Sequence, residues 1–282
     1  MVMASTRSIE VAIDIEAPRQ HVWAALTDEN QIPRWLAPSA SVKPGAGGYI
    51  ELSWGEGMTG RNTIDVWNPQ ERLVLVNKEQ GLREEYSLSE VGGGTRLSLV
   101  HSGFAVSPKV DDQYDAINNG WRTFFRMLKH AAKRGAGASY RNVTVFSPLS
   151  LTRDVAWHRI VRPSGITVGG LSPLTDGQRY ETMLRTGQHL IGSVVHCAWP
   201  GYLVLAADNM DDSLFALFCE RSSEGSLLTI TWILNGQAVI LGDSLHAQWS
   251  EWVTAAAGTF DPEAGVQATN LGLDHASVDQ SV

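Results

Sequence analysis

The sequence predicts an α+β protein built from two tandem copies of one domain, each a curved antiparallel sheet wrapped on a long C-terminal helix. Three observations support this fold class. The chain has 282 residues, which is enough for two domains of ordinary size. Two helical patterns share one spacing, and a series of β-rich hairpins precedes each of them, at an offset of about 130 residues. So long a period indicates duplicated domains, because the repeats of solenoids run to roughly 20–50 residues.

The two helical patterns are apolar stripes with the spacing i, i+4, i+7, i+8 and i+11. The first stripe comprises Ile117, Trp121, Phe124, Phe125 and Leu128. The second stripe comprises Leu245, Trp249, Trp252, Val253 and Ala256. Residues at this spacing share one face of a helix, and a curved sheet must bury one of its own faces. Each stripe therefore predicts a long helix that covers a sheet.

The elements of the first copy follow in order along the chain. We expect a strand at residues 8–15, short helices at 18–26 and 30–36, strands at 49–54, 61–67, 72–78, 82–90 and 95–102, and the long helix at 111–133. In the second copy, residues 203–207 match 72–76, residues 216–220 match 86–90, and residues 226–231 match 95–100. This alignment places Ala216 at the position of Tyr86. The second short helix is missing from copy two, because Pro163-Ser164-Gly165 breaks helices.

The composition shifts mark the expected domain limits. We predict copy one at residues 1–134 and copy two at residues 140–260, joined by a short linker rich in Gly and Ala. Residues 261–282 are small and polar and lack periodicity, so we expect a disordered tail there.

Charge and cysteine usage exclude several classes of partner. The net charge is −8, whereas nucleic-acid and anionic-membrane binders usually carry a basic surface. The sequence has neither a signal-peptide pattern nor an apolar run of about 18 residues, so we expect a cytoplasmic protein without a membrane span. Cys197 and Cys219 lack metal-ligand spacing, and reduced thiols are favoured over a disulfide. The 10 Trp are about three times the usual density and suit aromatic cores or ligand pockets.

No motif in the sequence assembles catalytic machinery. Residues 55–60 fit G-x-G-x-x-G, but a strand rather than a helix follows, so we predict a hairpin turn and no cofactor site. His189 and His196 are not joined by further ligands, so no metal is expected. The acidic pairs Glu84–Glu85, Asp111–Asp112 and Asp211–Asp212 are interpreted as solvated surface or helix caps.

The predicted ligand-binding residues are those that strand alternation and the first stripe direct to the interior of copy one. They are Trp35, Leu36, Ile50, Leu52, Trp54, Tyr86, Leu88, Leu97, Leu99, His101, Trp121, Phe124, Phe125 and Leu128. Each also suits an ordinary core position. His101 continues the alternation of Leu97 and Leu99, so it is expected either to bind a polar ligand group or to be a hydrogen-bonded structural histidine, and the structural role is favoured.

Copy one resembles the START-related helix-grip superfamily (Bet v-like, SRPBCC), in its branch similar to the activator of the Hsp90 ATPase. The resemblance rests on Glu16-Ala-Pro18 with residues 21–27, Arg34-Trp-Leu36, residues 68–74, residues 93–97 running into residues 101–104, and Gly120-Trp121. It implies a helix-grip fold with a hydrophobic cavity, and it extends to copy two through the internal repeat.

The resemblance leaves several functions open. We expect a non-enzymatic binder of a hydrophobic, aromatic or polycyclic small molecule, with natural-product self-resistance of the enediyne type as a narrower form. A chaperone-regulating interaction module is one alternative. An aromatic-polyketide cyclase is another, with His101, Tyr86 and Arg61 as its candidate polar groups. We expect copy one to hold the main cavity, because copy two loses the second short helix and replaces Tyr86.

Overall fold

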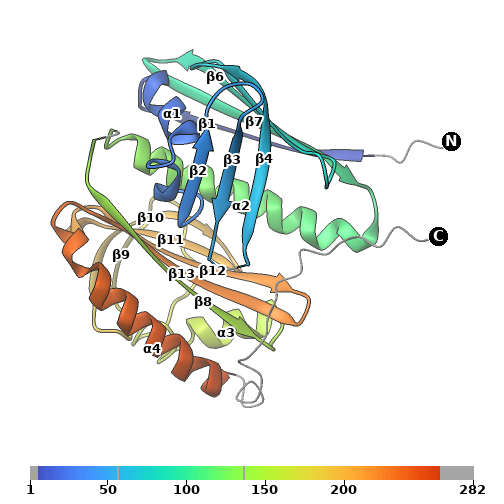
Figure 1. The fold of residues 1–282 in the computed structure, drawn as a ribbon. Helices are drawn as coiled ribbons and strands as arrows, with labels where there is room; N and C mark the ends of the chain where they lie inside the picture. The colour runs from blue at the N-terminus through green and yellow to red at the C-terminus, as the bar shows by residue number, and fades with distance from the viewer. Residues whose placement is uncertain (1–5, 56, 136, 261–282) are drawn as a thin grey trace.

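The computed structural model describes residues 6–55, 57–135 and 137–260. Figure 1 shows four layers: a first sheet at the top, one long helix beneath it, a second sheet, and two further helices at the bottom. The expected tail, residues 261–282, lies outside the described residues. The α+β class and the two tandem helix-grip units are confirmed.

The first sheet has seven antiparallel strands in the order β1-β7-β6-β5-β4-β3-β2. Their bounds are β1 Thr6–Ile15, β2 Ser39–Lys43, β3 Tyr49–Ser53, β4 Thr59–Asn68, β5 Arg72–Asn77, β6 Leu82–Val91 and β7 Gly94–Ala105. The helical segments of this half are α1 Arg19–Thr27, the 3-10 turn η1 Ile32–Arg34 and the long helix α2 Pro108–Ala132.

The second sheet has six antiparallel strands in the order β8-β13-β12-β11-β10-β9. Their bounds are β8 Tyr140–Leu149, β9 Arg179–Met183, β10 His189–Ala198, β11 Tyr202–Ala207, β12 Ser213–Ser222 and β13 Gly225–Asn235. The helical segments are α3 Arg153–Val161, the 3-10 turns η2 Asp208–Met210 and η3 Gly236–Leu241, and α4 Gly242–Phe260.

The two sheets share one topology, which supports the predicted duplication. Strand β8 takes the place of β1, and β13 to β9 take the places of β7 to β3. A β-bulge between β4 and β5 at Ile64/Val66 recurs between β10 and β11 at Val194/His196. A bulge shifts strand register locally, and such features are retained within related folds. Its return at the equivalent pair of strands indicates that the copies match element by element.

The pairing register corrects the predicted alignment of Tyr86 with Ala216. The shared bulge aligns Ile64 with Val194, so Leu73 matches Leu203, one residue before the match expected from aligning residues 72–76 with 203–207. Leu73 lies opposite Tyr86 in the first sheet, and Leu203 lies opposite Leu217 in the second. Leu217, not Ala216, therefore occupies the position of Tyr86. The connection before β12 is one residue longer than the connection before β6, and a slip of one residue turns every side chain to the other face of a strand.

Helix α2 is buried between the two sheets. One side of the helix packs against β1 and β7, and the opposite side packs against β10, β11 and β12. The second sheet presents to it an apolar face that joins the same core, made of Tyr202, Val204, Ala206, Leu214, Ala216, Phe218 and Ile233. The opposite face of this sheet packs on α3 and α4, around Phe215, Trp232 and Trp249. The second sheet is thus covered on both faces.

Two local expectations differ from the structure. The helix expected at residues 30–36 is only the three-residue turn η1. Pro33 lies inside it and lacks the N–H that a continuing helix requires. The short strand β2 was not anticipated. Its alternation is brief, with Ala40 and Val42 packed inward, and the chain before it contains Pro38.

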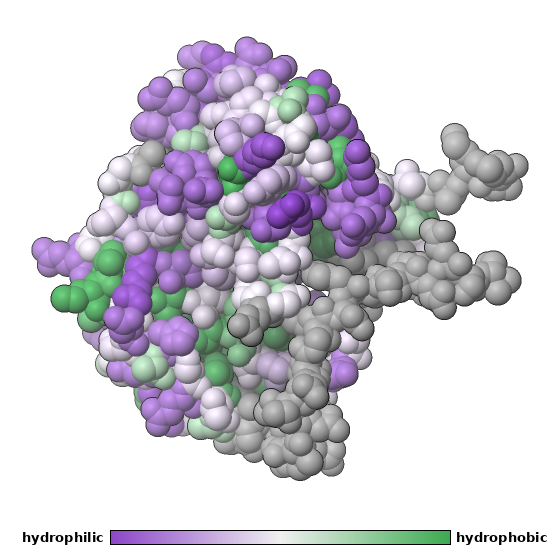
Figure 2. All heavy atoms as spheres, viewed as in Figure 1, coloured by the Kyte–Doolittle hydropathy of each residue, from purple (hydrophilic) through white to green (hydrophobic). Residues whose placement is uncertain are grey.

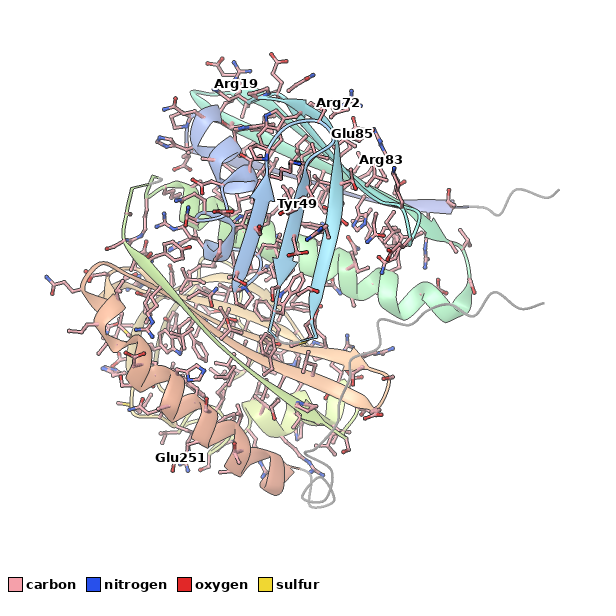
Figure 3. The ribbon with its side chains drawn as sticks, in the orientation of Figure 1. Arg19, Tyr49, Arg72, Arg83, Glu85 and Glu251 are labelled. Atoms are coloured by element: carbon pink, nitrogen blue, oxygen red, sulfur yellow. The ribbon has the colours of Figure 1, made fainter. Side chains whose placement is uncertain are left out.

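The outer face of the first sheet is charged. Figure 2 shows hydrophilic residues gathered over this sheet and α1, at the top of the view. Arg72 and Arg83 both pair with Glu85, at 2.8 and 3.6 Å, and Figure 3 shows the three side chains on the side away from α2. Within the described residues, no helix is both long and apolar enough to span a membrane.

Candidate functional site

Most of the predicted ligand-binding residues come together between the first sheet and α2. Ten of the fourteen are buried there: Trp35, Ile50, Tyr86, Leu88, Leu97, Leu99, His101, Trp121, Phe125 and Leu128. Leu36 and Leu52 are partly buried against the same core. We call the sheet surface that faces α2 the inner face. Strand alternation places Ile50, Tyr86 and Leu99 on it, as the sequence predicts.

Two of the predicted residues lie elsewhere. Phe124 turns to the other side of α2, where its ring centroid is 6.0 Å from that of Phe218 in the second sheet. Trp54 comes one residue after β3 ends, in the hairpin closed by the hydrogen bond from Trp54 N–H to the Met58 carbonyl. The turn of this hairpin includes Gly55, Gly57 and Met58, and Thr59 and Gly60 already belong to β4. Trp54 does not join the inner face because alternation ends with the strand.

A group of polar side chains lies on the otherwise apolar inner face. We define Asn62, Glu84, Tyr86, His101 and Trp121 as the inner polar cluster. The Tyr86 hydroxyl donates to Glu84 at 2.7 Å, and the Asn62 amide donates to the other Glu84 oxygen at 3.4 Å. The Trp121 indole N–H donates to His101 Nδ1 at 2.9 Å. Glu84 and His101 are direct partners across β6 and β7, so the two hydrogen-bonded groups adjoin.

The carboxyl group of Glu84 is held near its titration point at neutral pH. Burial raises the pKa of Glu84 to about 7, although the hydrogen bonds from Tyr86 and Asn62 act in the opposite direction. Burial and the neighbouring carboxylate together raise the pKa of Tyr86, so its hydroxyl keeps its proton. Glu84 therefore exchanges a proton in the physiological range, whereas Tyr86 is a constant donor.

His101 presents an N–H donor without an acceptor. Burial lowers the pKa of His101 to about 4, so the ring is neutral at pH 7. Because Nδ1 accepts the Trp121 hydrogen bond, the single ring proton is on Nε2. This Nε2 atom is buried and has no hydrogen-bond partner among the described residues. Buried donors normally find acceptors, so this N–H is available to an oxygen or nitrogen acceptor.

The second copy lacks this cluster, although its fold is the same. By strand register, Gly192, Phe215, Leu217 and Trp232 occupy the positions of Asn62, Glu84, Tyr86 and His101. Phe215 packs against Trp232 and Trp249 with ring centroids 4.9 and 5.6 Å apart. The fold therefore also closes with aromatic and aliphatic residues at these positions, and the polar cluster of copy one is not a requirement of the architecture.

Sequence reasoning missed two members of the cluster and misplaced a third candidate. Glu84 was interpreted as solvated, together with Glu85, and only Glu85 lies on the outer face. The alternation Leu82, Glu84, Tyr86 already contains the signal that places Glu84 inside. Asn62 carries no such signal by itself. Arg61 lies on the outer face, paired with Glu51 at 2.8 Å, so the predicted cyclase trio is not assembled.

Outside the inner polar cluster, ion pairs connect helix α2 of copy one to copy two. Asp176 of copy two accepts from Arg126 of α2 at 2.8 Å and contacts His196 Nδ1 at 3.1 Å. His130 of α2 contacts Asp212 Oδ2 at 3.2 Å. Burial lowers the pKa of both histidines. No cluster of three or more His, Cys, Asp or Glu side chains suited to a metal occurs in the described part of the chain.

The comparisons with known proteins concern mainly the first copy. Residues 16–133 match the family model described as Activator of Hsp90 ATPase homolog 1-like protein. No curated protein matches the chain. A solved structure from Mesorhizobium loti is 25% identical over 45% of this chain and 98% of its own, with a TM-score of 0.39.

Two further solved structures are similar to parts of the chain. The Aha1 dimer of Colwellia psychrerythraea is 21% identical over 46% of this chain and 99% of its own, with a TM-score of 0.42. DynU16, from the dynemicin biosynthetic locus, is 16% identical over 90% of this chain and 98% of its own, with a TM-score of 0.39. Because these TM-scores lie below 0.5, no function is transferred from these proteins. The family match and the observed topology confirm that residues 16–133 resemble an Activator of Hsp90 ATPase homolog 1-like domain of the START-type helix-grip fold.

Proposed function

We propose that the protein binds and sequesters a planar, hydrophobic small molecule at the inner polar cluster, without chemical conversion. The observation that carries the proposal is the contrast between the copies. Copy one keeps a titratable carboxyl group and a neutral histidine ring on its inner face, where copy two has Phe215 and Trp232. Polar groups buried without structural need are typical of binding sites.

The chemistry of the cluster specifies the ligand. The neutral His101 ring offers an Nε2–H donor, which suits a carbonyl or phenolic oxygen. Glu84 accepts a hydrogen bond when ionised and donates one when protonated, so a hydroxyl group beside that oxygen is also accommodated. The surrounding side chains, such as Leu99 and Phe125, are apolar. A polycyclic aromatic compound with adjacent carbonyl and hydroxyl groups meets these conditions.

Binding requires the inner face and α2 to separate locally. Leu99 and Phe125 are at most 1% exposed, so the ligand must displace side chains. Burying about 200 Å² of apolar ligand surface at about 25 cal/mol per Å² contributes roughly 5 kcal/mol before association costs. The cost of opening reduces this gain, so we expect weak binding, with a dissociation constant in about the millimolar range.

Quenching of tryptophan fluorescence by quinizarin (1,4-dihydroxyanthraquinone) tests the proposal. The wild-type protein should bind with saturable quenching. Leu99→Trp fills the interior and should abolish it, while thermal unfolding verifies the fold. His101→Phe removes the donor and should weaken binding about 5-fold, as the loss of one hydrogen bond does. His196→Phe is the matched control, a buried histidine outside the cluster, and should bind as wild type. Equal affinities of all four proteins would refute the proposal.

A narrower form of the proposal is self-resistance by sequestration of an enediyne-type natural product. This form is suggested by the resemblance to the START-related helix-grip superfamily. It assumes a cytoplasmic protein, in which the two free thiols, Cys197 and Cys219, stay reduced. The wild-type protein should protect plasmid DNA from cleavage by an enediyne in a stoichiometric manner. The variant Leu99→Trp should not protect it. DNA cleavage that the wild-type protein does not slow would exclude this form and leave quinizarin binding unaffected.

The family description favours one second candidate, regulation of a chaperone ATPase. The match covers residues 16–133, and the charged outer face of the first sheet offers a surface for a protein partner. The two functions separate in one assay. Ligand sequestration predicts that the protein leaves the ATP hydrolysis rate of Hsp90 unchanged, and a stimulation that saturates with protein concentration would favour the second candidate.

A further inference from the structure

A cleft of about 290 Å³ opens where the two copies meet. Copy one contributes the start of β2 and the β3–β4 hairpin, including Ser39, Ser53 and Trp54. Copy two contributes β8 and α4, including Arg141, Phe146 and His246. We call it the junction cleft. Its volume is just below the range for small-molecule sites, ~300–1,000 Å³. Neither copy alone forms it.

Two aromatic side chains in the junction cleft are only partly buried. Trp54 and Phe146 are both of intermediate exposure, and among the described residues no ring contact joins either of them to another aromatic side chain. Other tryptophans pair closely, as Trp23 does with Trp67 at 5.1 Å. Aromatic faces left open to water in a concave surface are favourable stacking surfaces for a planar ligand.

The rim of the junction cleft is rich in hydrogen-bond donors. Arg141 donates to Asp243 through Nη2, and a guanidinium group has five N–H donors in all. His246 and the hydroxyl group of Ser39 add further donors, whereas the Ser53 hydroxyl already donates to the Gly55 carbonyl at 3.4 Å. The carboxylate nearest to Arg141, that of Asp243, is already engaged and lowers the net positive charge of the rim. A ligand with an acceptor edge is therefore matched better than a cation.

We propose that the junction cleft is a second binding site, distinct from the inner polar cluster, for a planar aromatic molecule that carries a carboxylate or similar acceptor edge. The ring system lies between Trp54 and Phe146, and the acceptor edge meets Arg141 and the Ser39 hydroxyl. Such a site exists only because the copies are joined, so it is a function that the duplication added.

Anthracene-9-carboxylate is the probe, with energy transfer from tryptophan to the anthracene as the signal. Ser39→Trp fills the cleft from an exposed position and should weaken binding at least 10-fold. Ser41→Trp is the matched control, because Ser41 lies on the same strand and does not line the cleft. Phe146→Ala removes one aromatic wall and should also weaken binding. Thermal unfolding of each variant verifies the fold.

The variant Leu99→Trp separates this site from the proposed function. It should leave binding of anthracene-9-carboxylate unchanged while abolishing that of quinizarin. Equal affinities of Ser39→Trp and Ser41→Trp would overturn the junction site. A loss caused by Leu99→Trp alone would place the probe at the inner face and would also overturn it, with the proposed function intact.

Discussion

Glu84 and His101 lie side by side in the first sheet, and burial moves their protonation in opposite directions. The folded protein holds the Glu84 proton up to a pKa of about 7, above the ordinary 4.5, so this group lowers stability as pH rises between these values. His101 has a folded pKa of about 4, below its ordinary 6.5, so its contribution is lost as pH falls between these values.

The variant Glu84→Gln should therefore change the pH dependence of stability. It keeps the size of the side chain and one acceptor oxygen but cannot ionise. Relative to wild type it should therefore gain stability between about pH 5 and pH 8, on the order of 2 kcal/mol, since one pKa unit corresponds to about 1.36 kcal/mol. Urea unfolding at both pH values measures the difference. Because both proteins carry His101, its contribution largely cancels. A difference independent of pH would show that Glu84 is not buried as described.

The central tryptophan of each helix stripe should be a major source of stability. Trp121 and Trp249 are at most 8% exposed. Trp121→Ala and Trp249→Ala should each cost roughly 3–5 kcal/mol, as large aromatic truncations in cores do. Glu251→Ala is the control on α4, where Figure 3 shows the side chain at the outer side of the helix. A loss below about 1 kcal/mol at either tryptophan, typical of surface sites, would contradict the packing described.

At the residue scale, strand alternation correctly predicted which apolar side chains of the first sheet point inward, but it did not reveal all the polar groups among them. It placed Leu97, Leu99 and His101 correctly, because period two is a local property of a strand. Glu84 was missed because acidic neighbours usually indicate solvent. Trp54 was misplaced because the strand ends one residue earlier, and strand ends depend on pairing that sequence does not reveal.

At the element scale, α2 differs from the expected helix because it serves both sheets. Sequence predicted its stripe toward the first sheet, with Trp121 and Phe125. The sequences of β11 and β12 give an indication of the contact between α2 and the second sheet. They are continuous apolar runs, whereas polar and apolar residues alternate in β1. Continuous runs are typical of strands covered on both faces. The sequence did not predict that α2 covers this second face of β11 and β12, because no local sequence pattern identifies the surfaces through which two domains pack.

The contact between Phe124 and Phe218 should couple α2 to the second sheet energetically. A double-mutant cycle with Phe124→Ala and Phe218→Ala should give a coupling of about 0.5–1.5 kcal/mol, the range of aromatic pairs. In the control cycle, Phe124→Ala is combined with Phe215→Ala. Phe215 lies on the opposite face of β12, toward α4, so its effect should add to that of Phe124. Additivity in both cycles would rule out the contact.

At the scale of the whole molecule, the core of copy one continues across α2 onto one face of the second sheet. The linker predicted at residues 133–139 leaves each half with a complete set of elements, so residues 1–134 expressed alone should still unfold cooperatively. Residues 137–260 alone should associate, because separation exposes Val204, Leu214, Phe218 and the rest of that apolar face. Light scattering should show that this fragment self-associates, and that addition of residues 1–134 converts the aggregates into a one-to-one complex. A monomeric second half with the stability of the full chain would contradict this.

The most direct test of ligand capture at the inner polar cluster is histidine-selective nitrogen NMR of the full chain with and without quinizarin. In the free protein, His101 should appear as the neutral Nε2–H tautomer with Nδ1 hydrogen-bonded. On saturation, its Nε2 resonance should shift as the proton meets a ligand oxygen, while the resonances of His130 and His196 stay unchanged. A saturated complex in which the His101 resonances do not move would contradict the account.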